Sequence, residues 1–151
     1  MSAGRLPSLK GHSMLSWSEI REMHQCGITF GAHTLTHPDL TRLTFNQIKS
    51  EIYDSKAIIE DALSASVPCF AYPYGRYNDR IREFVRQHFT CACADKFGLI
   101  TAKSEFYSLE RIDACYFRTD RLFGVISTRL LPWYIWARCI PLRIQRAIRS
   151  D

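Results

Sequence analysis

Two histidines four residues apart, His33 and His37, are the side chains in this sequence best suited to binding a metal ion. Pro38 follows the second histidine and disfavours a right-handed helical conformation at His37, so a shared helix face is not expected. No glutamate follows His33, which excludes the His-Glu-x-x-His zinc pattern. We therefore predict a strand that ends at His33 and a tight loop that brings His37 back toward it.

Imidazole nitrogen is a good ligand for zinc and similar divalent ions. A catalytic zinc normally has three protein ligands and one position for water, so two histidines form an incomplete set and a carboxylate is expected from elsewhere. The alternative is that both rings only hydrogen-bond to nearby backbone. The neighbouring Gly31, Thr34 and Pro38 favour the metal site over this alternative.

The segments around the histidines alternate between helical and strand-like patterns. Two capping boxes, Ser16 with Glu19 and Thr44 with Gln47, predict helix starts, and Asn78 is suited to cap a third helix. Short apolar segments between these helices predict strands at residues 28–32, 69–72, 90–94 and 111–115. This alternation is typical of an α/β domain with a parallel sheet, in which sites form at the carboxyl ends of strands.

Composition excludes several classes of protein. A hydrophobic fraction of 46% in 151 residues indicates a folded domain, and no apolar run is long enough for a transmembrane segment. Residues 111–151 contain eight arginines and three aspartates, which accounts for the whole net charge of +5. We interpret this as a solvated basic surface rather than a lipid or nucleic-acid interface, because no nucleic-acid motif accompanies it.

Six cysteines are present, and none forms a Cys-x-x-Cys pair. They are expected to be buried free thiols rather than metal ligands or a disulfide framework. The first ten residues contain no apolar core of a secretory signal. Together these observations favour a reducing compartment such as the cytoplasm.

The histidine motif, His33-Thr34-x-x-His37-Pro38, resembles the metal-binding motif of the polysaccharide deacetylases, the NodB homology group also called carbohydrate esterase family 4. Residues 70–75 (FAYPYG) resemble the third motif of that family, commonly Phe-Arg-Pro-Pro-Tyr-Gly. The resemblance covers roughly residues 14–113. It implies an α/β fold, namely a partial distorted (β/α) barrel of the NodB or glycoside hydrolase-deacetylase type.

Three segments are expected from this resemblance. Residues 1–13 would be a leader or linker, and residues 14–120 would be the C-terminal part of the deacetylase-like barrel. Residues 121–151 would form a basic amphipathic extension. The family hydrolyses acetyl groups on polymers, so the implied substrate is an acetylated polysaccharide, either an N-acetylglucosamine polymer or an exopolysaccharide.

The resemblance also implies roles for individual residues. His33 and His37 would bind a divalent metal, with zinc as the expected ion. Tyr72, Pro73 and Tyr74 would line the substrate site, and the backbone N–H of Tyr74 would face the oxyanion of the tetrahedral intermediate.

The sequence departs from the family pattern in three ways. The opening motif Thr-Phe-Asp-Asp, which supplies the general base and the third metal ligand, is absent, and no late Leu-x-His motif supplies the general acid. Ala71 replaces the arginine that orients the base in many members. We therefore expect the first strands of the barrel to be absent from this chain, its activity to be impaired, and an uncovered barrel edge to favour self-association.

Two other classes of function remain open. One is a non-catalytic remnant of the deacetylase fold that binds a glycan or a protein. The other is a basic interaction domain that uses the arginine-rich segment. We rank both below the deacetylase hypothesis, and the first is the stronger rival.

Overall fold

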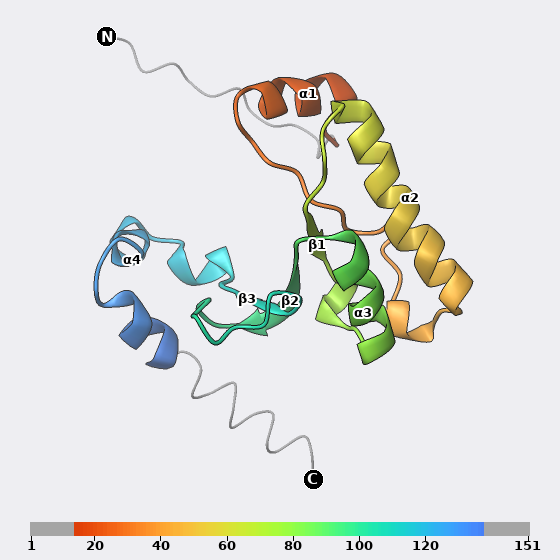
Figure 1. Ribbon diagram of the computed structural model, residues 1–151. Helices are drawn as coiled ribbons and strands as arrows, with labels where there is room; N and C mark the ends of the chain where they lie inside the picture. Colours follow the sequence, from red (N-terminus) through yellow and green to blue (C-terminus); the bar gives the residue numbers. More distant parts are fainter. Residues whose placement is uncertain (1–13, 138–151) are drawn as a thin grey trace.

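The computed structural model of the chain describes residues 14–137. The leader or linker predicted at residues 1–13 lies outside this range, as do residues 138–151 of the predicted C-terminal extension. Helices and short strands alternate along the described residues (Figure 1). The elements are α1 (Trp17–Gln25), η1 (Leu40–Arg42), α2 (Phe45–Leu63), β1 (Cys69–Ala71), η2 (Pro73–Gly75), α3 (Asp79–His88), β2 (Cys91–Phe97), β3 (Leu109–Arg111), η3 (Ala114–Phe117) and α4 (Asp120–Val125).

The three strands form one parallel sheet in the order β1-β2-β3. A single parallel bridge from Ala32 to Phe70 adds the segment before the histidines beside β1. This arrangement confirms the predicted α/β class with a parallel sheet. Residues 14–137 form no closed barrel, so the barrel architecture stays a prediction.

The strand boundaries differ from those expected. Residues 28–32 form only the bridge at Ala32, because the chain meets β1 at that one residue and is not paired before it. β2 runs to Phe97, beyond the predicted residue 94. β3 begins at Leu109, and the predicted strand at 111–115 is cut short because the Asp113 side chain accepts from the backbone N–H of Cys115 and starts η3.

The predicted helix starts are confirmed. The backbone N–H of Ser16 donates to Glu19 Oε2 at 2.7 Å, and that of Thr44 donates to Gln47 Oε1 at 2.9 Å. The Asn78 side chain accepts from the first turn of α3 at 3.0 Å. These caps satisfy N–H groups that have no partner within the helix, so each start is fixed locally.

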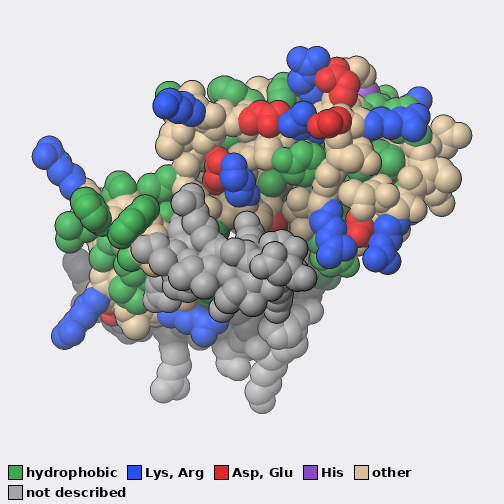
Figure 2. All heavy atoms as spheres, turned by 90° about the horizontal axis from the view of Figure 1, so that it is seen from below, with side chains coloured by type: hydrophobic (Ala, Val, Ile, Leu, Met, Phe, Trp, Pro, Cys, Tyr) green, Lys and Arg blue, Asp and Glu red, His purple; other side chains and the backbone are tan. Residues whose placement is uncertain are grey.

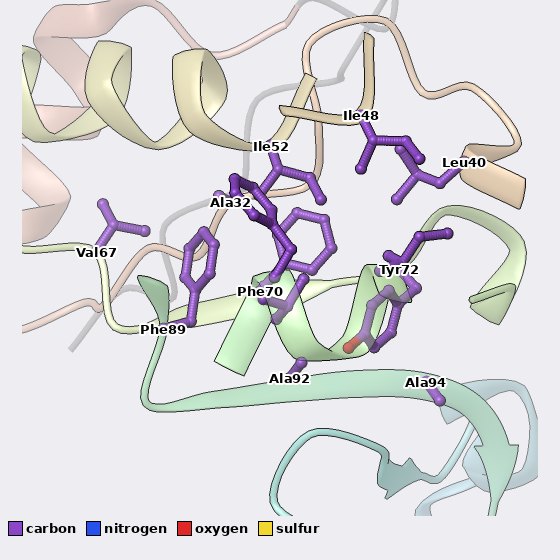
Figure 3. Packing of buried hydrophobic residues seen from close by; sticks show 13 residues of the cluster. Ala32, Leu40, Ile48, Ile52, Val67, Phe70, Tyr72, Phe89, Ala92 and Ala94 are labelled. Carbon is purple, nitrogen blue, oxygen red and sulfur yellow. The ribbon is translucent and has the colours of Figure 1, made fainter. Parts of the chain in front are cut away.

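The core lies between the sheet and the helices α2 and α3. Figure 1 shows both helices on one side of the strands. Figure 3 shows side chains of α2 facing those of β1, with Phe70 near the centre. Phe70 packs against Phe89 and Tyr72, with ring centres 5.2 and 5.3 Å apart. The buried members of the cluster are Ala32, Leu40, Ile48, Ile52, Val67, Phe70, Tyr72, Ile81, Phe84, Val85, Phe89, Ala92 and Ala94.

The segment after β3 is more open. It reaches away from the α2 and α3 layer in Figure 1, and Figure 2 shows hydrophobic side chains gathered at that end of the molecule. Residues 131–137 are helical, and Trp133 and Trp136 are 71% and 59% exposed. Self-association through uncovered apolar surface stays a prediction. No helix within residues 14–137 has the length and apolar character needed to cross a membrane.

Candidate metal centre

The sheet places His33 at the carboxyl end of its edge segment. The N–H of Ala32 donates to the Cys69 carbonyl, and the N–H of Ala71 donates to the Ala32 carbonyl, both at 2.9 Å. The next residue, His33, directs its ring Nδ1 at the Ala71 carbonyl, 2.7 Å away. A carbonyl oxygen only accepts, so Nδ1 carries the proton and Nε2 keeps the lone pair that a metal requires. The backbone of Ala71 thus orients His33 although its side chain is small.

A tight loop returns His37 to His33. Thr34 and His37 have positive φ angles of 66° and 57°, and the N–H of His37 donates to Thr34 Oγ1 at 3.1 Å. The ring centres of His33 and His37 are 4.8 Å apart with an interplanar angle of 72°. Two imidazoles on one tetrahedral zinc have ring centres about 5 Å apart, given Zn–N bonds of about 2 Å. The spacing of the two rings is thus that expected for two ligands of one divalent ion, and the tight loop that brings His37 back to His33 is confirmed.

Glu51 of α2 holds the middle of this loop. Its carboxylate accepts from the backbone N–H groups of Leu35 and Thr36 at 2.8 and 3.0 Å, and from Thr36 Oγ1 at 2.6 Å. Burial acts to raise the pKa of Glu51, but the hydrogen bonds from Thr36 and Leu35 outweigh it and the pKa is lowered. Glu51 is therefore ionised at neutral pH and attaches the loop to the core helix.

The loop on the other side of His37 belongs to the second motif found in the sequence, residues 70–75 (FAYPYG). Tyr74, in η2, has a positive φ of 56°, and its ring meets that of His37 edge-on with centres 4.7 Å apart. Gly75 has a φ of 62°, and a Cβ placed there would lie 2.3 Å from Cβ and 2.4 Å from the backbone nitrogen of Asp95 in β2. Only glycine fits this position. The close approach of Gly75 to β2 therefore determines where the neighbouring Tyr74 ring meets His37.

An ion pair joins the two motif loops. Arg76 Nη1 lies 2.7 Å from Asp39 Oδ2, and Asp39 also accepts from Thr41. The Thr41 side chain and then the Arg76 guanidinium lower the pKa of Asp39 to about 2. The Asp39 carboxylate is thus charged at neutral pH.

The remaining members of the predicted site have different environments. Tyr72 and Pro73 are fully buried, and Tyr72 Oη donates to the Tyr107 carbonyl at 3.1 Å. Burial raises the pKa of Tyr72 well above its usual range. Tyr74 is 58% exposed, so of these three it alone presents its side chain to solvent. Substrate contact by Tyr72 and Pro73 stays a prediction, and in this structure both act as supports for the loop.

The described residues do not form a complete set of metal ligands. No cluster of three or more histidine, cysteine, aspartate or glutamate residues is present among residues 14–137. His24 and His88 direct Nδ1 at backbone carbonyls, of Ile28 and Phe84, within four residues of each. As metal ligands, His33 and His37 would therefore provide two of the three protein ligands that a catalytic zinc normally has.

Sequence reasoning missed two supports of the site. Glu51 reaches the histidine loop only through the packing of α2, so the sequence offered no direct signal for it. Asp39 and Arg76 follow the histidine and tyrosine motifs directly, and their opposite charges could have indicated that the two loops meet.

Comparisons with known proteins indicate one family for this chain. The family model described as Polysaccharide deacetylase matches residues 7–89. YxkH of Bacillus subtilis, which carries the same family description, is 28% identical over 111 residues, or 73% of this chain and 40% of its own length.

Two solved structures are also similar. The deacetylase PplD of Streptococcus pyogenes, in complex with acetate, is 31% identical with a TM-score of 0.63, over 67% of this chain and 45% of that one. A polysaccharide deacetylase from Bacillus cereus is 30% identical with a TM-score of 0.60, over 67% of this chain and 33% of that one. The chain thus spans less than half the length of each of these three relatives.

The matched residues contain both motif loops, and the described α/β structure is similar to part of the deacetylase domains of carbohydrate esterase family 4, which are generally metal-dependent hydrolases. The chain belongs to the polysaccharide deacetylase family.

Proposed function

We propose that this chain provides the two-histidine part of a divalent metal centre, with zinc as the ion, for removing acetyl groups from a polysaccharide. The observation that carries the proposal is the pair of adjacent imidazoles, 4.8 Å apart, with His33 oriented by the Ala71 carbonyl. A divalent ion held by His33 and His37 would supply Lewis acidity toward the acetyl carbonyl and lower the pKa of water.

In this proposal, the other residues of the site orient the two histidines and stabilise the charge that develops on the substrate. His33 is held in one tautomer by Ala71, and His37 is held by its contact with the Tyr74 ring. The Tyr74 backbone N–H donates to the oxygen on which negative charge develops as the acetyl carbon becomes tetrahedral. The left-handed backbone conformation of Tyr74 raises the free energy of the folded state, and in this proposal it holds the N–H at the strand edge.

An acetylated polysaccharide, either an N-acetylglucosamine polymer or an exopolysaccharide, is the proposed substrate class. Family membership supports it, and acetate, the ion in the PplD complex, is the product of removing an acetyl group. Members of the family that act on exopolysaccharides often lack the arginine that Ala71 replaces, so Ala71 favours that subgroup. We propose that the chain alone has little activity, because no third ligand joins the two histidines among the described residues and the Thr-Phe-Asp-Asp motif that supplies the family's general base is absent from the sequence.

A chimera tests this proposal. The segment of the Bacillus cereus deacetylase that precedes the region matched here would be fused before residue 14, and acetate release from poly-N-acetylglucosamine and from an acetylated exopolysaccharide would be measured with zinc present. We expect the chimera to release acetate from at least one polymer, and the chain alone to release little. His33→Ala and His37→Ala chimeras should lose the activity while remaining folded.

Two outcomes would contradict the proposal. Robust acetate release by the chain alone would refute the expected impairment. A folded, zinc-binding chimera that releases no acetate from either polymer would refute the deacetylase function itself. Polysaccharide binding that survives alanine at both histidines, without bound metal, would favour the glycan-binding remnant, which the incomplete set of metal ligands makes the main rival.

A further inference from the structure

Two thiols face each other at the amino ends of β1 and β2. Cys69 and Cys91 are the first residues of these strands and are directly paired in the parallel register. Their sulfur atoms are 3.2 Å apart, close enough for the thiols to share a hydrogen bond. This end of the sheet is opposite the one that carries the histidines, and the proposed deacetylase function does not use it.

The pair lies on the sheet face that is turned away from the core. The neighbouring residues Phe70 and Ala92 are buried in the cluster formed with α2 and α3. Cys69 and Cys91 alternate with them and are only half-buried. A small reagent can therefore reach the thiols without unfolding of the core.

The strand geometry is compatible with a covalent link. Adjacent strands are about 4.8 Å apart, within the range of about 4.4–6.8 Å for Cα atoms joined by a disulfide. The sulfur atoms need to approach by only about 1 Å to reach bonding distance. Burial, with the hydrogen bond that Cys91 shares with Cys69, raises the pKa of Cys91 to about 11, so Cys91 is protonated at neutral pH and is not expected to attack the oxidant first.

We propose that Cys69 and Cys91 are a redox modification site that forms a cross-strand disulfide with a small disulfide oxidant such as oxidised glutathione. One protein thiol, as thiolate, attacks the oxidant, forms a mixed disulfide and releases one glutathione. The other protein sulfur then displaces the second glutathione and gives up its proton to solvent. Two protein thiols are oxidised by two electrons, and one oxidised glutathione is reduced to two thiols.

The disulfide would join β1 to β2 close to the segment that carries the proposed metal ligands. The Cys69 carbonyl accepts from the N–H of Ala32, which directly precedes His33. Closing a loop of the chain between residues 69 and 91 also restricts the unfolded state. We expect the oxidised protein to unfold at a temperature about 5 °C higher than the reduced protein.

Cys93 offers a matched control within the same strand. It is half-buried on the same face but is paired with Ala71 rather than with a cysteine. We would prepare one variant that keeps only Cys69 and Cys91 and another that keeps only Cys69 and Cys93, with serine at the other cysteine positions. Both would be treated with oxidised glutathione under native conditions and analysed by intact mass.

The first variant should lose two hydrogens and carry no glutathione, and a reducing agent should reverse both this change and the rise in unfolding temperature. The second should retain a glutathione adduct. If the serine variants do not fold, the oxidised full chain should give a disulfide between the tryptic peptides 57–76 and 87–96, assigned to Cys91 by fragmentation. Glutathione adducts at both Cys69 and Cys91, unreacted thiols, or a bond to any other cysteine would overturn the proposal.

Discussion

The two ends of the small sheet are built differently although they share the same strands. The carboxyl ends carry imidazoles, an ion pair and backbone in unusual conformations. The amino ends carry the paired thiols Cys69 and Cys91, and all the described positive-φ residues near the sheet are found at the other end. The difference supports our proposal that the carboxyl end binds a ligand, because unusual backbone conformations cost free energy.

The distribution of positive φ angles supports this view. Of the six residues with positive φ among those described, Gly27 and Ser64 lie at helix C-termini, where such angles are ordinary. The other four lie in the two motif loops: Thr34, His37, Tyr74 and Gly75. Three of these four are not glycine, and each such residue costs about 1 kcal/mol or more. The predictions below test whether contacts to the rest of the fold hold these loops in place.

Gly75→Ala should have the largest effect on stability. The new Cβ would clash with the backbone of Asp95 and add the cost of a left-handed alanine, so we expect a loss of about 3 kcal/mol in the free energy of unfolding, measured by urea denaturation. Gly27→Ala is the matched control, because Gly27 has a φ of 90° but an added Cβ meets nothing within 4 Å. It should cost about 1 kcal/mol. Equal losses in the two variants would show that the contact with β2 is unimportant.

Glu51→Gln should have the next largest effect. The amide keeps one acceptor but removes the charge that binds three donors in the histidine loop, so we expect a loss of about 1–2 kcal/mol. Faster amide hydrogen exchange should be confined to Leu35, Thr36 and their neighbours. Asp54→Asn, which removes the same charge from an exposed position of α2, is the control and should leave that exchange unchanged.

The pH dependence of Glu51 provides a check on the same contact. Its pKa is lowered in the folded state, so it contributes stability above the ordinary carboxyl value of 4.5 and this contribution is lost as the pH falls through the lower folded value. The difference in stability between wild type and Glu51→Gln should therefore shrink below pH 4.5. A difference that is constant down to the acid transition would contradict the role assigned to the carboxylate.

Asp39→Asn should have the smallest effect on stability and the most distinctive pH profile. Asp39 has a folded pKa of about 2 against an ordinary value of 3.8, so its contribution is complete above pH 3.8 and disappears as the pH falls through about 2. The unfolding temperatures of wild type and variant should differ by a constant amount from pH 7 to pH 5 and converge in strong acid. Asp79→Asn, which breaks an exposed pair with Arg82 inside one helix, is the control. An equal change in unfolding temperature in both variants would mean that the ion pair between the loops stabilises the fold no more than an exposed pair within one helix.

Local sequence determined much of this fold. The capping residues Ser16, Thr44 and Asn78 act over three residues, so the helix starts were predictable. The loop at His37 was predictable because Pro38 restricts the residue before it. The limits of β2 and β3 were not, because a strand ends where its neighbour ends rather than where its own apolar pattern stops.

The supports of the site were harder to predict for the same reason. Glu51 and the loop at Leu35 are 16 residues apart, and Asp39 and Arg76 are 37 apart, so each contact depends on how whole elements pack. Burial of Tyr72 likewise depends on tertiary contacts, with the stacked ring of Tyr77 and the Tyr107 carbonyl, and could not be predicted from the motif, in which Tyr72 resembles a substrate contact.

Metal titration tests the central claim most directly. Cobalt(II) would be added to the metal-free chain and to the His33→Ala and His37→Ala variants, with His88→Ala as control, and zinc would then compete for the same site. We predict one cobalt bound per chain with visible absorption that zinc displaces, an affinity at least tenfold lower in either loop variant, and no change in the control. Equal affinity in wild type and both loop variants, or no binding by the wild-type chain, would contradict the account.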